Sequence, residues 1–246
     1  IRRAEYMTID LTDYTPTRED YEFTGWYADE DLTEEITSIR LTRNTTVYAG
    51  WEEIKENPST GFENPFTDVS ESDWFFNDVK FVYQNGLMNG TSATTFSPEG
   101  TTSRGMIVTI LYRMSGAPAV TGSNPFTDVK STDYCYDAVR WAVESGITKG
   151  VSATEFNPNG LLTRQEIAAF LYRYAELVGY DTTKSGNIQL YQDADQVFDW
   201  AQDAMKWAVG SEIIKGASAT QLKPADNATR EQIAVMVWRL VTANQG

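Results

Sequence analysis

The chain has 246 residues, of which 41% are hydrophobic and 13% aromatic, so it has room for two small folded domains or a repeat array plus one module. Its net charge of −15 argues against a nucleic-acid partner, because duplex binding needs a basic face. The absence of His excludes His-based catalysis and His metal ligands, and the single Cys135 excludes an intrachain disulfide. We therefore expect no metal and no cofactor. No apolar stretch reaches membrane-spanning length, so we expect no membrane span.

Residues 1–54 are expected to form a β-rich module, because short runs of alternating or β-branched and aromatic residues recur there. The runs are Glu5–Leu11, Tyr21–Tyr27, Ile36–Leu41 and Thr45–Trp51. Gly25 and Asn44 are expected to mark turns. Residues 55–63, which include Pro58 and Gly61, are expected to be a linker. The chain begins at Ile1 rather than Met, so we interpret it as a fragment in which a missing signal peptide says nothing about export.

The rest of the chain is organised around one stretch that occurs three times. Gly150–Arg173 reads GVSATEFNPNGLLTRQEIAAFLYR, and it matches Gly90–Arg113 and Gly216–Arg239 without a gap. In each copy a Gly precedes x-Ser-Ala-Thr, an apolar residue, x-Pro, Ser/Thr-Arg and an amphipathic run. Residue types that are kept three times in a divergent repeat are under a shared constraint.

Each copy is expected to be a helix–loop–helix unit, so the fold class is mainly α. The copies open with an aromatic–x–Asp motif and carry an aromatic residue just before the first helix; the Asp residues are Asp68, Asp128 and Asp193, and the aromatics are Trp74, Tyr134 and Trp200. The first helix shows apolar i, i+3, i+4 spacing and is expected to end at Gly86 and Gly146, which suit a left-handed cap. Glu212 stands there in the third copy, so its cap is expected to differ. The expected boundaries are 64–120, 121–182 and 183–246. One such helical pair cannot bury its apolar face alone, so we expect the three to pack together.

The second helix is expected to begin after the N-cap residues Ser103, Thr163 and Thr229. Glu166 and Gln232 are placed to complete capping boxes in copies two and three, whereas Met106 breaks the box in copy one.

The recurring Arg104, Arg164 and Arg230 occupy the first helical position, where a cation is unfavourable next to the positive end of the helix dipole. A rule broken three times suggests a compensating partner. One alternative is a salt bridge to the Asp of the same repeat, namely Asp68, Asp128 or Asp193. The other is an anion site in which the Arg, the helix N-terminus and loop N–H groups converge on a carboxylate or phosphate.

The aromatic residues Trp74, Tyr134 and Trp200 also allow two interpretations. They are either core residues, which is the commoner fate, or exposed platforms that stack on a sugar ring. Carboxylates are abundant, but no pair recurs at a spacing typical of a glycosidase, so we do not expect an enzyme.

Two resemblances follow from these motifs. The N-terminal segment, with Phe23-Thr24-Gly25-Trp26-Tyr27 and Thr46-Val47-Tyr48-Ala49-Gly50-Trp51, resembles the Listeria–Bacteroides repeat and implies a small β-grasp-like module with a spacer or adhesion role. Residues 64–243 resemble three tandem S-layer homology domains, whose T-R-A-E motif corresponds to Ser103–Met106, Thr163–Glu166 and Thr229–Gln232.

The second resemblance implies a pseudo-threefold spindle, an extracellular location at the cell wall or S-layer of a Gram-positive bacterium, and binding to an anionic secondary cell wall polysaccharide, often with pyruvylated N-acetylmannosamine. It places ligand contacts at the three Arg, at the aromatics and at Gly90, Gly150 and Gly216. Lys149 and Lys215 precede that Gly in copies two and three, whereas copy one has Asn89, so we expect a weaker groove around copy one. The alternative is a structural unit that self-associates in a lattice and binds no glycan.

Overall fold

The computed structural model describes residues 7–12, 14–16, 18, 21–41, 45–53 and 62–244. The chain divides into two compact units, residues 1–62 and 63–246. Most of the expected linker and the expected turn residue Asn44 lie outside the described residues.

The first unit is a small β module, as the sequence predicts. Its strands are β1 Met7–Asp10, β2 Tyr21–Tyr27, β3 Glu35–Ile36, β4 Ser38–Leu41 and β5 Tyr48–Glu53. β1 pairs with β4, and β2 lies between β3 and β5, all antiparallel. The expected turn at Gly25 is wrong: Gly25 lies inside β2 where the register with β5 shifts, with φ 148°, so it provides a β-bulge.

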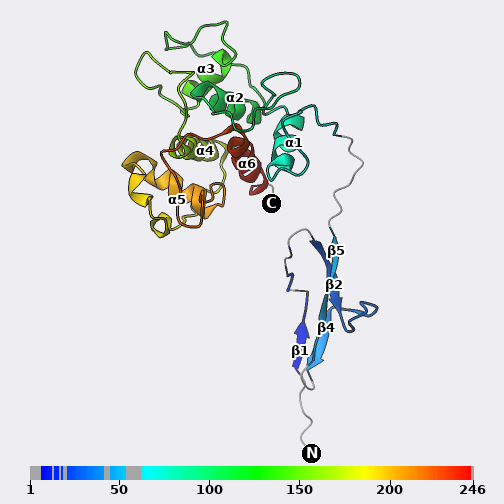
Figure 1. Cartoon of the computed structure of the whole chain (residues 1–246). Coiled ribbons are helices and arrows are strands. Elements are labelled where there is room, and N and C mark those ends of the chain that lie inside the picture. Colours follow the sequence, from blue (N-terminus) through cyan, green and yellow to red (C-terminus); the bar gives the residue numbers. More distant parts are fainter. Residues whose placement is uncertain are drawn as a thin grey trace, which may run out of the picture. The chain divides into compact units, whose positions relative to one another are not determined.

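The second unit is helical, and each repeat contributes two α-helices. They are α1 Phe76–Gln84, α2 Arg104–Met114, α3 Tyr136–Glu144, α4 Arg164–Val178, α5 Gln202–Gly210 and α6 Arg230–Thr242. Short 3₁₀ turns, η1 Ile188–Leu190, η2 Ala194–Gln196 and η3 Asp199–Ala201, precede α5. The second helix of each repeat packs on the first helix of the next: α2 on α3, α4 on α5, and α6 back on α1. The repeats therefore close into a ring in which the first and last helices lie side by side (Figure 1).

A triangle of backbone hydrogen bonds lies where the three repeats meet. Thr102 N–H donates to the Ala228 carbonyl, Leu162 N–H to Thr102, and Ala228 N–H to Leu162, each at 3.0 Å. All three residues are fully buried. Each stands just before the N-cap position of a second helix, so the triangle fixes the starting points of α2, α4 and α6 relative to one another.

The apolar stripes predicted from helical spacing form the core around this triangle. Ile107, Ile167 and Ile233 are fully buried, and Leu111, Leu171 and Val237 lie one turn further along, also fully buried. Cys135 is a free, buried residue at the N-terminus of α3, as expected for a small hydrophobe.

The helix ends confirm the predicted caps in part. Thr163 and Glu166 form a full capping box on α4, and Ser103 accepts from Met106 N–H without the reciprocal bond. The expected box in the third copy is wrong, because Thr229 makes no side-chain cap and Gln232 accepts from Arg164 instead. The expectation of a different cap after α5 is wrong, because Glu212 takes the same left-handed conformation as Gly86 and Gly146, at φ 57°.

The first prediction concerns Thr102, one of the three residues of this triangle. The Thr102 hydroxyl is buried without a hydrogen-bond partner, so Thr102→Val removes an unsatisfied polar group while keeping the shape of the side chain. We expect the free energy of unfolding to rise by about 1 kcal/mol in urea titrations. Thr109→Val is the matched control, because the Thr109 hydroxyl donates to the Gly105 carbonyl at 2.7 Å and its loss should destabilise. Equal effects of the two variants would contradict the assignment.

The second prediction concerns Asp78, on the helix α1 that packs on α6 where the ring closes. Asp78 lies on α1, and the equivalent residues of the other repeats are Ala138 on α3 and Ala204 on α5, both of which are buried. Burial raises the pKa of Asp78 to about 6, and the positive charge of Arg239 on α6 offsets only part of that rise. A carboxyl whose pKa is higher in the folded chain loses its favourable contribution to folding as pH rises from about 4 through 6.

We therefore expect Asp78→Ala to stabilise the helical unit by about 1 kcal/mol at pH 7, after allowing for solvent screening. The difference in unfolding free energy should vanish below about pH 4, where the unfolded carboxyl is also protonated. Thermal melts at both pH values measure this, and a gain of the same size at pH 3.5 would show that it does not come from ionisation.

Candidate ligand-binding grooves

Each recurring Arg lies against the loop of the following repeat in the ring. The Nε of Arg104 donates to the Phe156 carbonyl at 2.9 Å, that of Arg164 to Leu222 at 2.8 Å, and that of Arg230 to Phe96 at 2.8 Å. The sequence alternative of an ion pair with the Asp of the same repeat is wrong. In the described parts of the chain, none of these three guanidinium groups lies within 4.0 Å of a carboxylate.

The backbone at the start of each second helix makes the same crossing. The N–H groups of Arg104 and Gly105 donate to the carbonyls of Gly160 and Pro158 in the next repeat, and α4 and α6 repeat the pattern. These carbonyls satisfy N–H groups that an isolated helix would leave unpaired. They also place negative charge beside an Arg that the helix dipole disfavours. The helix N-terminus is therefore occupied by the protein itself, which corrects the idea that its N–H groups hold an anion.

The recurring Asp residues shape the loops that receive the Arg. Asp68 accepts from the N–H groups of Phe96 and Ser97, Asp128 from Phe156 and Asn157, and Asp193 from Leu222 and Lys223, all at 2.7–2.9 Å. Burial would raise the pKa of Asp193, but its two backbone bonds outweigh burial and hold the pKa below the ordinary value. Ser97, Asn157 and Lys223 each adopt a left-handed conformation before a Pro, and the Asp stabilises it.

The three glycines of the predicted site are needed for packing. A Cβ added to Gly150 would collide with the Phe126 ring and with loop carbonyls, and Gly90 and Gly216 stand in the same relation to Phe66 and Tyr191. The glycines thus let the opening aromatic ring of each repeat lie directly against the loop.

The aromatics Trp74, Tyr134 and Trp200 are exposed, so the core interpretation is wrong for all three. They are 66%, 64% and 55% exposed, whereas the next residue in each repeat, Phe75, Cys135 or Ala201, is buried.

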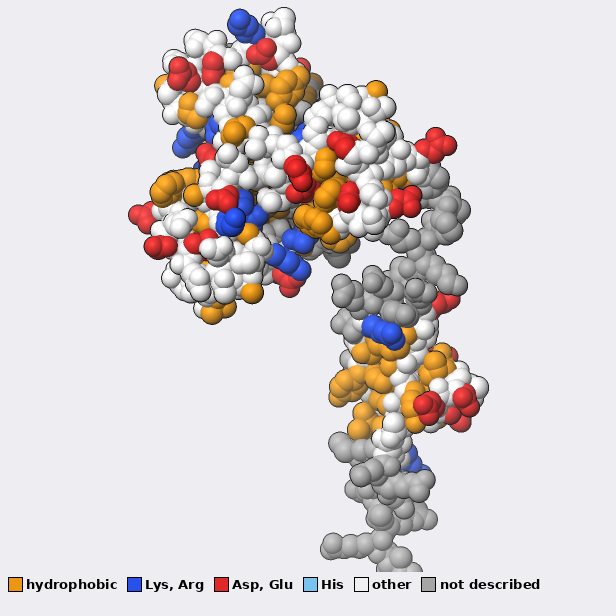
Figure 2. Space-filling model, in the orientation of Figure 1, with side chains coloured by type: hydrophobic (Ala, Val, Ile, Leu, Met, Phe, Trp, Pro, Cys, Tyr) orange, Lys and Arg blue, Asp and Glu red, His pale blue; other side chains and the backbone are white. Residues whose placement is uncertain are grey.

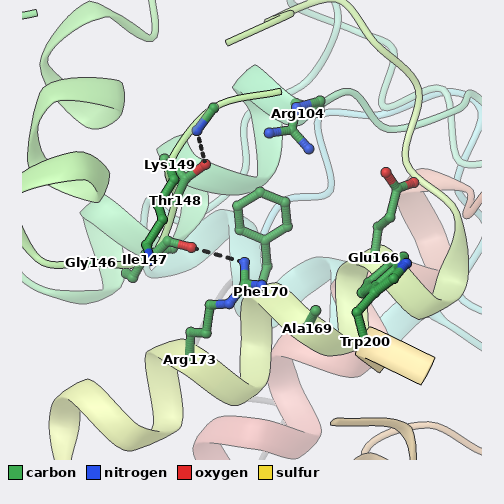
Figure 3. Close-up of a pocket in the computed structure, with 11 residues that line it drawn as sticks. Arg104, Gly146, Ile147, Thr148, Lys149, Glu166, Ala169, Phe170, Arg173 and Trp200 are labelled. Atoms are coloured by element: carbon green, nitrogen blue, oxygen red, sulfur yellow. Dashed lines mark hydrogen bonds between the residues drawn. The ribbon is translucent and has the colours of Figure 1, made fainter. Parts of the chain in front are cut away.

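The first groove has a volume of about 470 Å³ and combines residues of all three repeats. Figure 3 shows Arg104 from the first repeat facing Phe170 of the second, between Lys149 on one side and Glu166 with Trp200 of the third repeat on the other. Arg173 lies at the opposite end, where its guanidinium donates to the Ile147 carbonyl at 3.2 Å. Three cations thus line the groove with one carboxylate, that of Glu166.

Arg104 is the most unusual side chain of this groove. It is only 9% exposed, and its guanidinium carbon lies 5.0 Å from the Phe156 ring and 5.4 Å from the Phe170 ring. Its Nε is bonded, but its two terminal nitrogens make no hydrogen bond to the described residues. Burial lowers the pKa of Arg104, and the nearby Glu166 opposes that change. Its unbonded terminal nitrogens face the cavity, where they can donate charge-assisted hydrogen bonds.

The second groove, of about 330 Å³, is built in the same way from Arg164, the Lys215–Gly216 loop and Trp74. Here the guanidinium is engaged: one terminal nitrogen donates to the Lys215 carbonyl at 2.7 Å and the other to Gln232 at 3.4 Å. A ligand would have to compete with these internal bonds.

The third equivalent position is built around Arg230, which donates to the Asn89 carbonyl at 2.7 Å. Tyr134 lies against Gly105 of α2. Asn89 and Met106 stand where the other two positions have Lys and Glu or Gln. These two departures of copy one therefore belong to the position built around Arg230 and not to the groove of Arg104, and a weaker groove there stays a prediction.

Sequence reasoning also missed groove residues. Phe170 and Arg173 line the first groove but were not singled out as site residues, and Phe170 is at the same time a buried core residue. Phe198 was not singled out either; it is 58% exposed and lies 6.1 Å from the Trp200 ring. The distance from Asp193 to Trp200 is one residue longer than the corresponding distance in the other repeats, and this insertion was the available signal.

Figure 2 shows one face of the helical unit, with Asp and Glu side chains dispersed over it and Lys and Arg side chains in fewer places. The described residues contain no cluster of three or more His, Cys, Asp or Glu that could hold a metal ion. Among them, too, no helix has the length and apolar character needed to cross a membrane.

Comparison with known proteins agrees with this architecture. The family model of the S-layer homology domain matches residues 65–105, 125–168 and 191–234, and that of the Listeria–Bacteroides repeat domain matches residues 4–50. The repeat matches end early in each second helix and begin at the aromatic–x–Asp motif, so each covers one unit of the ring.

Several relatives are surface proteins or enzymes of bacteria. The chain is 32% identical over 191 residues to an endoglucanase of Bacillus sp. (strain KSM-635), which covers 76% of this chain and 20% of the relative. It is 37% identical over 166 residues to the surface-layer 125 kDa protein of Lysinibacillus sphaericus, covering 66% and 14%. It is 25% identical over 183 residues to the cellulosome-anchoring protein of Acetivibrio thermocellus, covering 72% and 39%.

The chain thus spans well under half of the length of each of these relatives. The three matched repeats and the likeness to a surface-layer protein and an anchoring protein indicate a non-catalytic module that attaches to the cell surface. With three matched repeats closed into one ring, the chain belongs to the S-layer homology domain family and is an extracellular, cell-wall-associated anchoring module.

Proposed function

We propose that the helical unit anchors its parent protein by binding an anionic secondary cell wall polysaccharide, with the first groove as the principal site. The observation that supports this most directly is the state of Arg104. A guanidinium that is more than nine-tenths buried, with both terminal nitrogens unbonded and pointing into a cavity, lacks the partner that buried charges normally have.

The rest of the groove fits a charged sugar. A carboxylate of the glycan would accept two parallel hydrogen bonds from the Arg104 terminal nitrogens, and Lys149 and Arg173 would add positive potential. Trp200 offers an exposed ring for stacking against the apolar face of a pyranose. Glu166 accepts from Thr163 through one oxygen, so its other oxygen is available to a sugar hydroxyl. A pyruvylated N-acetylmannosamine residue supplies this combination of carboxylate, hydroxyl groups and apolar ring face.

We expect the three positions to differ in affinity, because the terminal nitrogens of their Arg side chains differ in their internal bonds. Those of Arg104 are unbonded, whereas Arg164 would have to break its bonds to Lys215 and Gln232. Arg230 is bonded to the Asn89 carbonyl, in a position without a neighbouring Lys. Asp68, Asp128 and Asp193 hold the loops and act as positioning residues, because both oxygens of each already accept backbone bonds.

The decisive experiment compares Arg104→Ala with Arg230→Ala in calorimetric titrations against purified wall polysaccharide. Both variants lose the bond from Nε to a loop carbonyl, so both should melt at a lower temperature. A charge-assisted hydrogen bond contributes about 1.5–3 kcal/mol, so Arg104→Ala should weaken binding about ten-fold or more. Arg230→Ala should change the affinity less than about two-fold.

Arg104→Lys tests the geometry of the contact, because a lysine restores the charge but cannot donate two parallel bonds. It should recover only part of the affinity. Polysaccharide from which the pyruvyl groups have been removed should bind the wild-type chain as weakly as intact polysaccharide binds Arg104→Ala. Wild-type affinity in a folded Arg104→Ala protein would refute the assignment of the first groove.

A further inference from the structure

A further pocket, at the C-terminal ends of α5 and α6, gathers positive charge beside the second groove and shares two of its cations with that groove. We call it the α5–α6 pocket; it has a volume of about 400 Å³, and its walls include Lys184, Lys215, Trp238 and Arg239, with Glu212 as its only acidic residue. Three of the 20 basic residues of a chain with net charge −15 thus converge on one hollow.

Arg239 has lost the structural partner that its equivalents keep. Arg113 donates to the Leu87 carbonyl at 3.1 Å and Arg173 to Ile147 at 3.2 Å. The guanidinium of Arg239 makes no hydrogen bond and no ion pair with the described residues, although it is only partly exposed. Burial lowers the pKa of Arg239, while Asp78 on α1 and Glu212 act in the opposite direction. Arg239 therefore has free donors in a place where an anion would relieve the cost of burial.

The other walls of the pocket also offer unused donors. The indole N–H of Trp238 has no partner among the described residues, and the side chain is 38% exposed. Its equivalents differ: Tyr112 packs against Trp141, and Tyr172 against Trp207. The one opposing carboxylate, Glu212, lies 3.5 Å from Lys215 Nζ, but both side chains are largely exposed, so this ion pair is weak.

The pocket is a neighbour of the second groove, because Lys215 and Arg239 line both. A polymer chain seated in the second groove therefore meets the α5–α6 pocket along the same two side chains. We propose that the α5–α6 pocket is an additional anion subsite, which holds a carboxylate or phosphate carried by a neighbouring residue of the glycan bound in the second groove. This inference rests on the proposed polysaccharide binding and extends it from one charged sugar to a longer segment.

The subsite can be separated from the grooves by mutation, because Lys184 lines the α5–α6 pocket and neither groove. Lys184→Ala should weaken binding of wall-polysaccharide fragments with several charged residues about three- to ten-fold. The same variant should bind fragments with a single charged residue as wild type does. Lys130→Ala is the control for net charge, since Lys130 is exposed in the second repeat and lines none of these cavities.

A second variant should act in the opposite direction. Glu212→Gly removes the only carboxylate of the pocket and places at this left-handed position the residue found in the other two repeats. It should tighten binding of the multiply charged fragments about two- to five-fold and should also raise the melting temperature. The melting temperature alone would rise from relief of backbone strain, so only the gain in affinity supports the subsite.

The outcomes separate this inference from the function on which it rests. If Arg104→Ala weakens binding while Lys184→Ala and Lys130→Ala behave alike with the long fragments, the grooves bind glycan and the α5–α6 subsite is refuted. An equal loss for short and long fragments on Lys184→Ala would also refute it, because a subsite needs a second charged residue. If the wild-type chain binds no fragment, the proposed function fails and the subsite fails with it.

Discussion

The helical unit depends on the bonds that each second helix makes with the repeat that follows it. A helix that begins with Arg has a cation beside its positive end, and its first N–H groups have no partner within the helix. In isolation its N-terminus would therefore be unstable. The carbonyls of the next loop correct both defects at once, and the last correction runs from Arg230 back to Phe96, 134 residues earlier. One repeat cannot supply this partner to itself. The same contact thus explains why Arg recurs and why the ring must close.

Because the ring is closed, the Arg, the loop and the aromatic residue of one repeat belong to three different groove positions. The first groove takes its Arg from the first repeat, its Lys–Gly loop from the second and its aromatic ring from the third. A substitution of the Arg, the loop or the aromatic residue of one repeat therefore changes one wall of a groove whose other walls come from the other two repeats. Asn89 and Met106 belong to the position that Arg230 completes, while Arg104 from the same repeat lines the first groove. Three similar repeats have in this way produced three positions whose Arg side chains differ in their unbonded donors.

The sequence predicted what local periodicity controls. Apolar spacing located the helices and their buried faces, and the N-cap residues located where α2, α4 and α6 begin. It could not group the site residues, because the partner of each Arg depends on which repeat follows in space. The Thr229–Gln232 cap failed for the same reason, since Gln232 is drawn to Arg164 of another repeat. The exposure of the three aromatic residues could have been predicted more easily. In each repeat the residue after the aromatic, Phe75, Cys135 or Ala201, is the buried one, and the spacing of the apolar residues in the helix that follows indicated this.

An acidic protein that binds an acidic polymer needs contacts that do not depend on its net charge. Repulsion between exposed charges is screened beyond about 8 Å at physiological ionic strength, whereas a guanidinium that is 9% exposed interacts with a bound carboxylate through little intervening solvent. On the proposed function, the burial of Arg104 is what would make anion binding compatible with a net charge of −15. Burial is in turn possible only because the Phe156 carbonyl and two aromatic rings of the next repeat surround the side chain. The contact between Arg104 and the next repeat is therefore both part of the ring's closure and the basis of the proposed anion site.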